Sequence, residues 1–330
     1  MSPMAMILCL FIIFSPLQRS FSHNDPCDDP EILRNPQDLR SDQITVMING
    51  YSEHRIPLLR SIAAAYSGCL VVSAVLVLWG NPSTPRHVIR RLSRDLTSAS
   101  IGPASISVIP QSSTSLNARF LPRRAIRTRA VLVCDDDVEV DLRSVDFAFK
   151  IWASNPERLI GLFARSHDID LSGKEWIYTV HPDRYSIVLT KFMILSTKFL
   201  FKYSCGGGGE PIAKMRRVVD EMRNCEDILM NFVVADETNA GPILVGAERA
   251  RDYGDSRNEG EREEEVREVG LSRRRGEHRK RRGECMMEFH RILGRMPLRY
   301  SYGKVVNSVG EQGLCKKGGK LVFCDESVGE

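Results

Sequence analysis

The chain has 330 residues, 42% of them hydrophobic and 27% charged, and a formal net charge of +4. This is enough for one large α/β domain, or two small ones, with a well-buried core. Much of the basic excess lies in one late run, so the net charge does not mark the whole protein as a nucleic-acid binder.

The N-terminus is predicted to be a targeting segment. Its apolar core, residues 4–14, has the length of a signal-peptide core and is too short to span a bilayer, which takes about 20 residues. We expect residues 1–22 to be a signal peptide, with a short membrane anchor or a truncated sequence as alternatives. Each places the chain in the secretory pathway, and an anchor would give membrane association through the N-terminus. Residues 23–41 are expected to be a polar stem.

Strands and helices alternate in the first half of the chain. Apolar, β-branched runs predict strands at 44–51, 70–80 and 106–110, and helical spacing predicts helices at 57–66 and 86–96. This alternation indicates the α/β class, with a Rossmann-like, mostly parallel sheet flanked by helices.

The second half is predicted to continue in the same style. Its expected elements are a helix at 146–154, a strand at 159–165, a hairpin of 176–180 with 185–196, and helices at 211–223 and within 285–306. The charged insert 249–281 is either an exposed helix or a mobile loop. Its basic run, 273–282, has the composition of a nucleic-acid patch, but the secretory leader argues against that partner and no nucleic-acid partner is expected. A solvated loop and a basic lid over an anionic substrate are the alternatives. His54, His167 and His278 are expected to be solvated or loop residues.

The fourth strand, 130–140, ends in charge, because four apolar residues run into Asp135, Asp136 and Asp137. Ligands of open α/β sheets bind at the carboxyl ends of strands. Three adjacent carboxylates repel one another unless a positive charge lies among them, and hard divalent cations bind carboxylate and phosphate oxygens. A metal–diphosphate site is one interpretation, and an acidic turn after a strand is the other.

Five motifs in one order resemble the exostosin-like glycosyltransferases of family 64, over roughly residues 42–325. They are ITVMINGYSEHRIPLL at 44–59, LNARF at 116–120, AVLVCDDD at 130–137, NCEDILMNFVVA at 224–235, and RRGECMMEF at 281–289 with MPLRYS at 296–301. The first motif and GKVVNSVGEQGLC at 303–315 are similar to a plant subgroup. That subgroup includes proteins that glycosylate glycosyl inositol phosphorylceramide sphingolipids.

The resemblance implies a GT-A fold over 42–325, with a nucleotide-binding half at 42–140, an acceptor half at 141–325 and a tail at 326–330. It also implies a retaining glycosyltransferase of the secretory pathway, in the Golgi. The donor would be GDP-mannose or a UDP-sugar, and the acceptor a glycan or a sphingolipid. A non-catalytic carbohydrate-binding member and a metal-dependent phosphohydrolase are the alternatives.

The resemblance assigns a donor site to the acidic strand end. Asp137 would bind Mn²⁺ directly, with Asp135 as a second contact nearer the ribose or sugar, and the cation would stabilise the leaving diphosphate. Contacts to the nucleotide sugar are implied for Asn49, Arg55, Asn81, Asn117, Arg119, Asp135 and Asp136. For Asn49 and Asn81 a turn-forming role stays open. Thr114 departs from the asparagine that relatives often carry near the nucleotide.

The resemblance implies two catalytic residues, Asp227 on the acceptor side of the cleft and Arg282 close to the leaving group. The carboxylate would act on the acceptor hydroxyl or the oxocarbenium-like centre, and the arginine would neutralise the departing diphosphate. A structural alternative for Asp227 is helix capping. A disulfide between Cys225 and Cys285 is implied, with two buried thiols as the alternative. Cys315 could pair with Cys324, and Cys134 is expected to be a small core residue.

Overall fold

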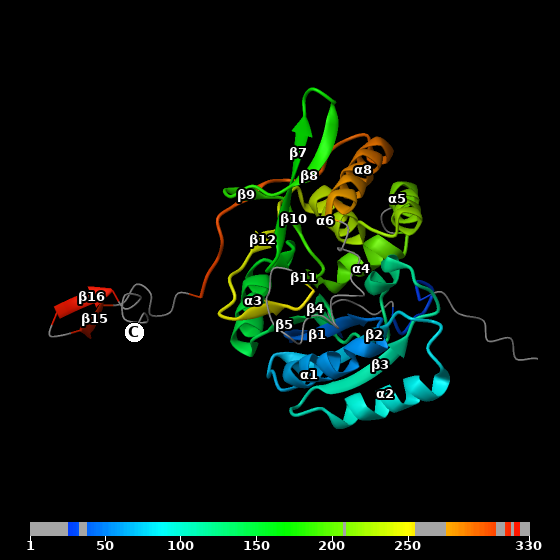
Figure 1. Ribbon diagram of the computed structural model, residues 1–330, viewed down its shortest axis with the longest axis vertical. Helices are drawn as coiled ribbons and strands as arrows, with labels where there is room; N and C mark the ends of the chain where they lie inside the picture. Colours follow the sequence, from blue (N-terminus) through cyan, green and yellow to red (C-terminus); the bar gives the residue numbers. More distant parts are fainter. Residues whose placement is uncertain are drawn as a thin grey trace, which may run out of the picture.

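A central seven-stranded sheet organises the described part of the chain, residues 26–32, 38–206, 209–254, 275–307, 314–317 and 320–323 of the computed structural model. Its strand order is β12-β6-β11-β4-β1-β2-β3 (Figure 1). Neighbouring strands are parallel except where β11 pairs antiparallel with β4 and β6. The predicted mixed α/β architecture, with a mostly parallel sheet flanked by helices, is confirmed.

Residues 40–135 follow the predicted alternation closely. Their elements are β1 (Arg40–Gly50), α1 (Ile56–Ser67), β2 (Val72–Trp79), α2 (Arg86–Ser98), β3 (Ser105–Pro110) and β4 (Thr128–Asp135). Alternate residues of these strands enter two different cores: Val46 and Ile48 pack on one face of the sheet, and Met47 on the other. This period of two, with apolar residues at every position, is the pattern of a strand buried on both faces.

Helices cover both faces of the sheet. One core joins the sheet to α1, α2 and α3 (Leu142–Ser154). The other joins it to α4 (Thr197–Ser204), α5 (Gly209–Met222), α6 (Glu226–Thr238) and α8 (Arg275–Leu293). Cys134 is fully buried in the first core, as expected. No helix of the described residues has the length and apolar character needed to cross a membrane.

The acidic strand is shorter than predicted. β4 ends at Asp135, and after two turn residues β5 (Val138–Val140) pairs antiparallel with β13 (Ala250–Asp252) in a separate sheet. The prediction of one strand over 130–140 is therefore wrong at its carboxyl end. The chain turns at Asp136 and Asp137, which both form ion pairs with Arg55. A continued strand would point these two adjacent side chains to opposite faces of the sheet, so both could not reach Arg55.

The predicted hairpin of 176–180 with 185–196 is also wrong. β8 (Glu175–Thr179) pairs instead with β7 (Ala164–Asp170), and this hairpin projects beyond the helices in Figure 1. β11 (Phe192–Ser196) joins the central sheet between β4 and β6 (Ile160–Gly161). Alternation alone marks a strand and does not identify its partner.

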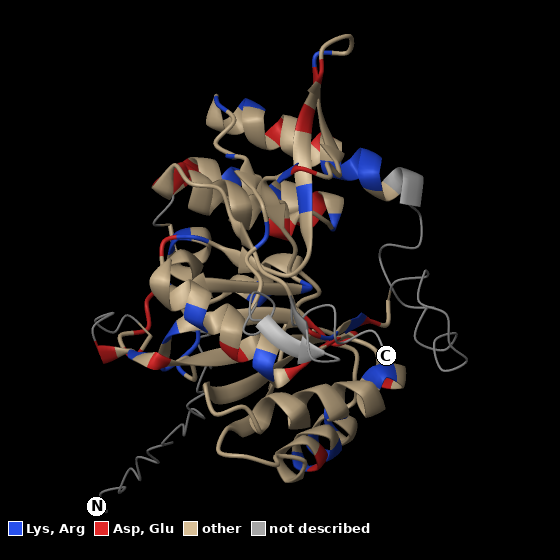
Figure 2. Cartoon of the chain, turned by 90° about the vertical axis from the view of Figure 1, so that its left-hand side faces the viewer, with Lys and Arg blue, Asp and Glu red and all other residues tan. Residues whose placement is uncertain are grey.

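Short strands complete the described part of the chain after residue 140: β9 (Arg184–Tyr185) with β14 (Ser301–Tyr302), β10 (Ile187–Val188) on β7, and β12 (Ile243–Leu244) on β6. β15 (Leu314–Lys317) and β16 (Lys320–Phe323) pair with each other. The helix predicted within 285–306 begins earlier, at Arg275, so the basic run includes its first turns (Figure 2).

His167 is not a solvated or loop residue. It lies in β7, 4% exposed, with Nδ1 2.7 Å from the Ser186 hydroxyl and its ring stacked on Tyr300. Burial lowers the pKa of His167 to about 4, so the ring is neutral at physiological pH. The expectation is corrected: this histidine is part of the core beneath the β7–β8 hairpin.

A disulfide between Cys27 and Cys205 joins the predicted stem to the end of α4. Arg124 extends the attachment through ion pairs with Asp29 and Glu31. Residues 1–22, residues 255–274 of the charged insert, and Cys324 of the suggested Cys315–Cys324 pair lie outside the described residues.

Candidate functional site

The site begins where β1 and β4 end side by side. Asn49 is opposite Asp135 in the parallel register, and its side-chain amide donates a hydrogen bond of 3.0 Å to the Cys134 carbonyl. The Asp136 amide donates in turn to the Asn49 carbonyl at 3.2 Å. These bonds fix the point at which the three aspartates leave the sheet.

Arg55 holds two of the aspartates. It lies in a short 3-10 helix, Glu53–Arg55, directly after β1, and its Nη1 is 2.9 Å from Asp136 Oδ1 and 3.0 Å from Asp137 Oδ2. Burial raises the pKa of Asp136 to about 6, although Arg55 acts in the opposite direction. One guanidinium thus balances only part of the negative charge at this strand end.

Arg119 connects the acidic strand end to the start of α6. It lies in the 3-10 helix Leu116–Phe120, and its Nη1 is 3.3 Å from Asp135, 2.7 Å from the Thr190 hydroxyl and 3.1 Å from Glu226. Burial raises the pKa of Asp135 to about 7 against the opposing charge of Arg119. One nitrogen atom therefore contacts carboxylates from both halves of the domain.

Glu226 is the site residue that the sequence analysis missed. It is the first residue of α6, buried, and accepts a hydrogen bond from Thr190 at 3.4 Å in addition to its pairing with Arg119. Burial raises the pKa of Glu226, and Arg119 counters it. The available signal was a second carboxylate beside Asp227 at the start of an apolar helix.

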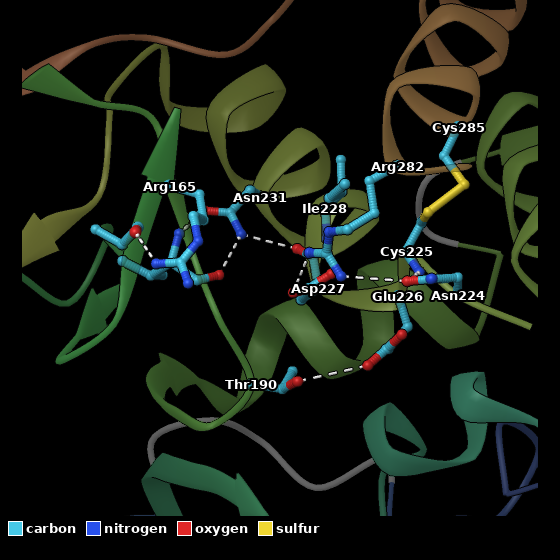
Figure 3. A network of polar contacts seen from close by, with 12 residues as sticks. Arg165, Thr190, Asn224, Cys225, Glu226, Asp227, Ile228, Asn231, Arg282 and Cys285 are labelled. Atoms are coloured by element: carbon cyan, nitrogen blue, oxygen red, sulfur yellow. Dashed lines mark hydrogen bonds and ion pairs between the residues drawn. A yellow bond between two sulfur atoms is a disulfide. The ribbon is translucent and has the colours of Figure 1, made fainter. Parts of the chain in front are cut away.

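Asp227 and Arg282 form a buried ion pair across α6 and α8, with Arg282 Nη2 2.5 Å from Asp227 Oδ2 (Figure 3). Arg282 Nη1 also donates to Asn224 at 3.2 Å, and the guanidinium lies 4.5 Å from the Tyr178 ring centre. Burial alone would lower the pKa of Arg282, but Asp227 and Tyr178 outweigh it and the pKa is raised.

Helix capping, the structural alternative for Asp227, explains the contact of only one of its two carboxylate oxygens. Its Oδ1 accepts from the Ile228 amide at 2.8 Å, which is a local bond at a helix start. The N-cap residue itself is Cys225, which makes no side-chain cap bond. Oδ2 is used for Arg282, so the residue has a tertiary role as well.

The Cys225–Cys285 disulfide, which the resemblance implied, is present and ties the start of α6 to α8 (Figure 3). Cys225 has a φ of 78°, in the left-handed region that non-glycine residues rarely adopt. This strained residue directly precedes Glu226 and Asp227. Backbone strain of this kind is often found at functional sites.

Asn81 and Asn117, which are expected to contact the nucleotide, form hydrogen bonds with other parts of the protein. Asn81 accepts from the Ser83 amide at 3.0 Å, a turn-forming bond after β2. Asn117 is buried, donates to the Arg216 carbonyl and accepts from the Tyr203 hydroxyl. Among the described residues, the hydrogen-bond partners of these two side chains do not include the acidic strand end.

The site has features that suit an anionic ligand with a divalent cation. Among the described residues, no three His, Cys, Asp or Glu side chains are grouped to hold a metal ion by themselves. Asp135 and Asp137 instead offer two carboxylates, and phosphate-bound divalent ions commonly take one or two carboxylates and obtain the rest from the substrate. The buried Nε atoms of Arg119 and Arg282 have no hydrogen-bond partner, which leaves two cationic donors for such a ligand.

Comparison with known proteins finds relatives over most of the chain. A model described as the glycosyl transferase family 64 domain matches residues 44–310. Glycosyltransferase family protein 64 C3 of Arabidopsis thaliana is 68% identical over 301 residues, which cover 91% of each chain.

Two further relatives are more distant. Glycosylinositol phosphorylceramide mannosyl transferase 1 of Arabidopsis thaliana is 28% identical over 280 residues, 80% of this chain and 76% of the relative. Exostosin-1 of Pongo abelii is 36% identical over 199 residues, which are 59% of this chain and 25% of that protein.

Proposed function

The chain belongs to glycosyl transferase family 64, and we propose that it is a retaining, Mn²⁺-assisted enzyme that moves a sugar from a nucleotide-diphosphate sugar to a glycan or glycolipid acceptor. The observation that carries this proposal is the position of Arg119, whose Nη1 contacts Asp135 and Glu226 at once. The acidic strand end and the start of α6, with the Asp227–Arg282 pair, therefore belong to one site.

The donor side is proposed to bind the diphosphate. Asp137 and Asp135 would hold Mn²⁺, which supplies electrostatic stabilisation of the departing diphosphate when it is bound. Arg55 keeps Asp136 and Asp137 in place, and Arg119 adds a guanidinium that suits phosphate oxygens. Asn49 lies at the end of β1, where it would contact the nucleotide.

The acceptor side is proposed to act on the sugar carbon. Asp227 would stabilise the positive charge that develops at the anomeric carbon, and Arg282 would orient this carboxylate and favour the departure of the diphosphate. Both side chains are buried and mutually paired, so their geometry is set before the substrate binds. Such preorganised charge is effective because it needs no rearrangement during the reaction.

The relatives suggest which substrates to test first. The mannosyl transferase name points to GDP-mannose as donor and a sphingolipid head group as acceptor, whereas UDP-sugars and glycan acceptors remain in the proposal. Two disulfides support a lumenal position in the secretory pathway, for which we propose the Golgi. Membrane association through the N-terminal segment is part of the same proposal.

The test is a nucleotide-release assay of the full chain with GDP-mannose and UDP-sugars, with and without Mn²⁺ and acceptor. We expect release that depends on Mn²⁺ and increases with acceptor. Asp137→Ala should abolish it, because a proposed metal ligand is lost, and should leave the melting temperature within a few degrees, because Arg55 keeps its ion pair with Asp136. Loss of folding in this variant would show that the acidic residues are structural.

The same assay separates the alternatives. A phosphohydrolase would release inorganic phosphate from simple esters, and a carbohydrate-binding protein would bind an acceptor without consuming any donor. Either result would overturn the transferase proposal.

A further inference from the structure

The turn that follows β13 lies directly against Asp137. β13 pairs with β5 so that Asp252 is opposite Val138, and the Tyr253 amide donates to the Asp137 carbonyl at 2.8 Å. The Gly254 amide donates to Asp252 Oδ1 at 3.1 Å. A segment more than 100 residues later in the sequence (about 115 by its numbering) thus fixes the surroundings of one aspartate of the triplet.

Gly254 is the residue of this turn that approaches the carboxylate most closely. A Cβ atom added to Gly254 would lie 2.4 Å from Asp137 Oδ2 and 3.3 Å from Asp137 Cγ. The backbone of Gly254 is outside the left-handed region, so alanine would fit its φ without strain. Glycine is therefore needed here for the space it leaves beside the carboxylate.

Other glycines with equally close neighbours differ in what they approach. A Cβ at Gly102 or Gly241 would lie 2.5 Å from a backbone oxygen, so substitution there would disturb the chain path. At Gly254 the obstructing atom is the end of a side chain, which can rotate away. The backbone would then keep its course, and the position of the Asp137 carboxylate would change.

The Asp137 carboxylate occupies a defined position that a side chain at residue 254 would change. It is 9% exposed and its Oδ2, the atom that a methyl group would displace, is 3.0 Å from Arg55 Nη1. Asp252, which accepts the hydrogen bond from the Gly254 amide, is itself held by an ion pair with Lys191. A methyl group at position 254 would thus push this oxygen out of its contact with Arg55 rather than push the turn aside.

We propose that Gly254 is a positioning residue for the metal-binding carboxylate, and that its lack of a side chain keeps Asp137 oriented for the cation and the donor diphosphate. This inference rests on the proposed role of Asp137 in binding Mn²⁺. It adds that the acceptor half of the chain, through β13 and its turn, sets the affinity of the donor site for the cation. Substitutions of residues that orient metal ligands commonly reduce metal affinity by about 10- to 100-fold.

The test compares wild type, Gly254→Ala and the control Gly246→Ala in the full chain. Gly246 precedes the same strand, and a Cβ there would meet the exposed side chains of Val306, at Cγ1, and Lys304, at Cε, at 3.0 and 3.1 Å. Melting temperatures are measured without metal, then during titration with Mn²⁺ in the presence of GDP and, separately, UDP. For Gly254→Ala we expect a metal-free melting temperature near that of wild type and an Mn²⁺ half-saturation at least ~10-fold higher. Gly246→Ala should titrate like wild type.

Three outcomes would overturn the inference. If Gly254→Ala titrates like wild type, the glycine does not position the carboxylate. If Gly254→Ala fails to fold, or melts far below wild type without metal, the added methyl group displaces the backbone and not the carboxylate. If wild type does not respond to Mn²⁺ with either nucleotide, the proposed metal role is wrong and the inference falls with it, a result that differs visibly from the other two.

Discussion

Buried opposite charges define the site at the scale of single residues. Arg119 and Arg282 each face carboxylates that are almost completely buried, with Asp227 only 3% exposed. Removal of one member of such a pair leaves an uncompensated charge in a poorly solvated place, which costs about 3–5 kcal/mol, although replacement of both members can be nearly neutral. Function and stability can therefore be separated by comparing single and double variants.

We predict that Arg282→Met destabilises the protein by roughly 3–5 kcal/mol, whereas Asp227→Asn/Arg282→Met recovers much of that loss. Turnover should fall at least ~10²-fold in Arg282→Met, in Asp227→Asn and in the double variant, because charge at the reacting centre is lost in each. Chemical unfolding and nucleotide-release rates measure the two effects. Near-normal turnover in Asp227→Asn would remove this carboxylate from the chemistry.

At the scale of elements, the β7–β8 hairpin links the core to the site. Tyr178 of β8 lies against Arg282, and its strand partner His167 stacks on Tyr300 beneath the hairpin. His167 has a pKa of about 4 in the folded protein because it is buried, against about 6.5 for an exposed histidine. Between these values the unfolded chain binds more protons than the folded one, so acidification through this window favours unfolding.

His167→Gln should flatten the pH dependence of stability between about pH 6.5 and 4. The full shift corresponds to about 3 kcal/mol, which the wild type loses on acidification and the variant does not. Asp135 and Asp136 have raised pKa values and act in the opposite direction, because the folded protein then binds more protons as the pH falls. The measured quantity is therefore the difference between the two proteins across the pH range. Parallel curves would show that His167 titrates normally.

At the scale of the whole molecule, the two disulfides have different positions relative to the site. Cys27–Cys205 attaches the stem to α4 and closes 178 residues, whereas Cys225–Cys285 closes 60 residues and joins the two helices that carry Asp227 and Arg282. Chain-entropy estimates give about 4–5 kcal/mol for loops of these lengths, and measured values are often lower.

We predict that Cys27→Ser/Cys205→Ser lowers the melting temperature and leaves kcat unchanged at temperatures where the protein stays folded. Cys225→Ser/Cys285→Ser should lower both, because α6 and α8 lose the covalent link beside the Asp227–Arg282 pair. Thermal denaturation and steady-state kinetics at one low temperature distinguish the two variants. Equal kcat values would assign both bonds to stability alone.

The sequence by itself determined the class of the fold and most of the site's chemical groups. The apolar, β-branched runs around residues 46–48 and 131–133 are typical of strands buried on both faces, and the acids that follow are then expected at the carboxyl end of the sheet. Motifs shared with family 64 identified Asp227, Arg282 and the Cys225–Cys285 pair, all of which the structure brings together.

Only the tertiary structure decided the partners of these groups. Local periodicity does not report which strand pairs with which, so β8 and β11 were assigned to the wrong neighbours. It does not report the environment of a side chain either, so Glu226 was missed and His167 was placed in solvent. The physical reason is the same in each case: charge pairing and burial depend on segments distant in sequence, such as Arg119 beside Glu226 and Gly254 beside Asp137, which meet only when the chain has folded.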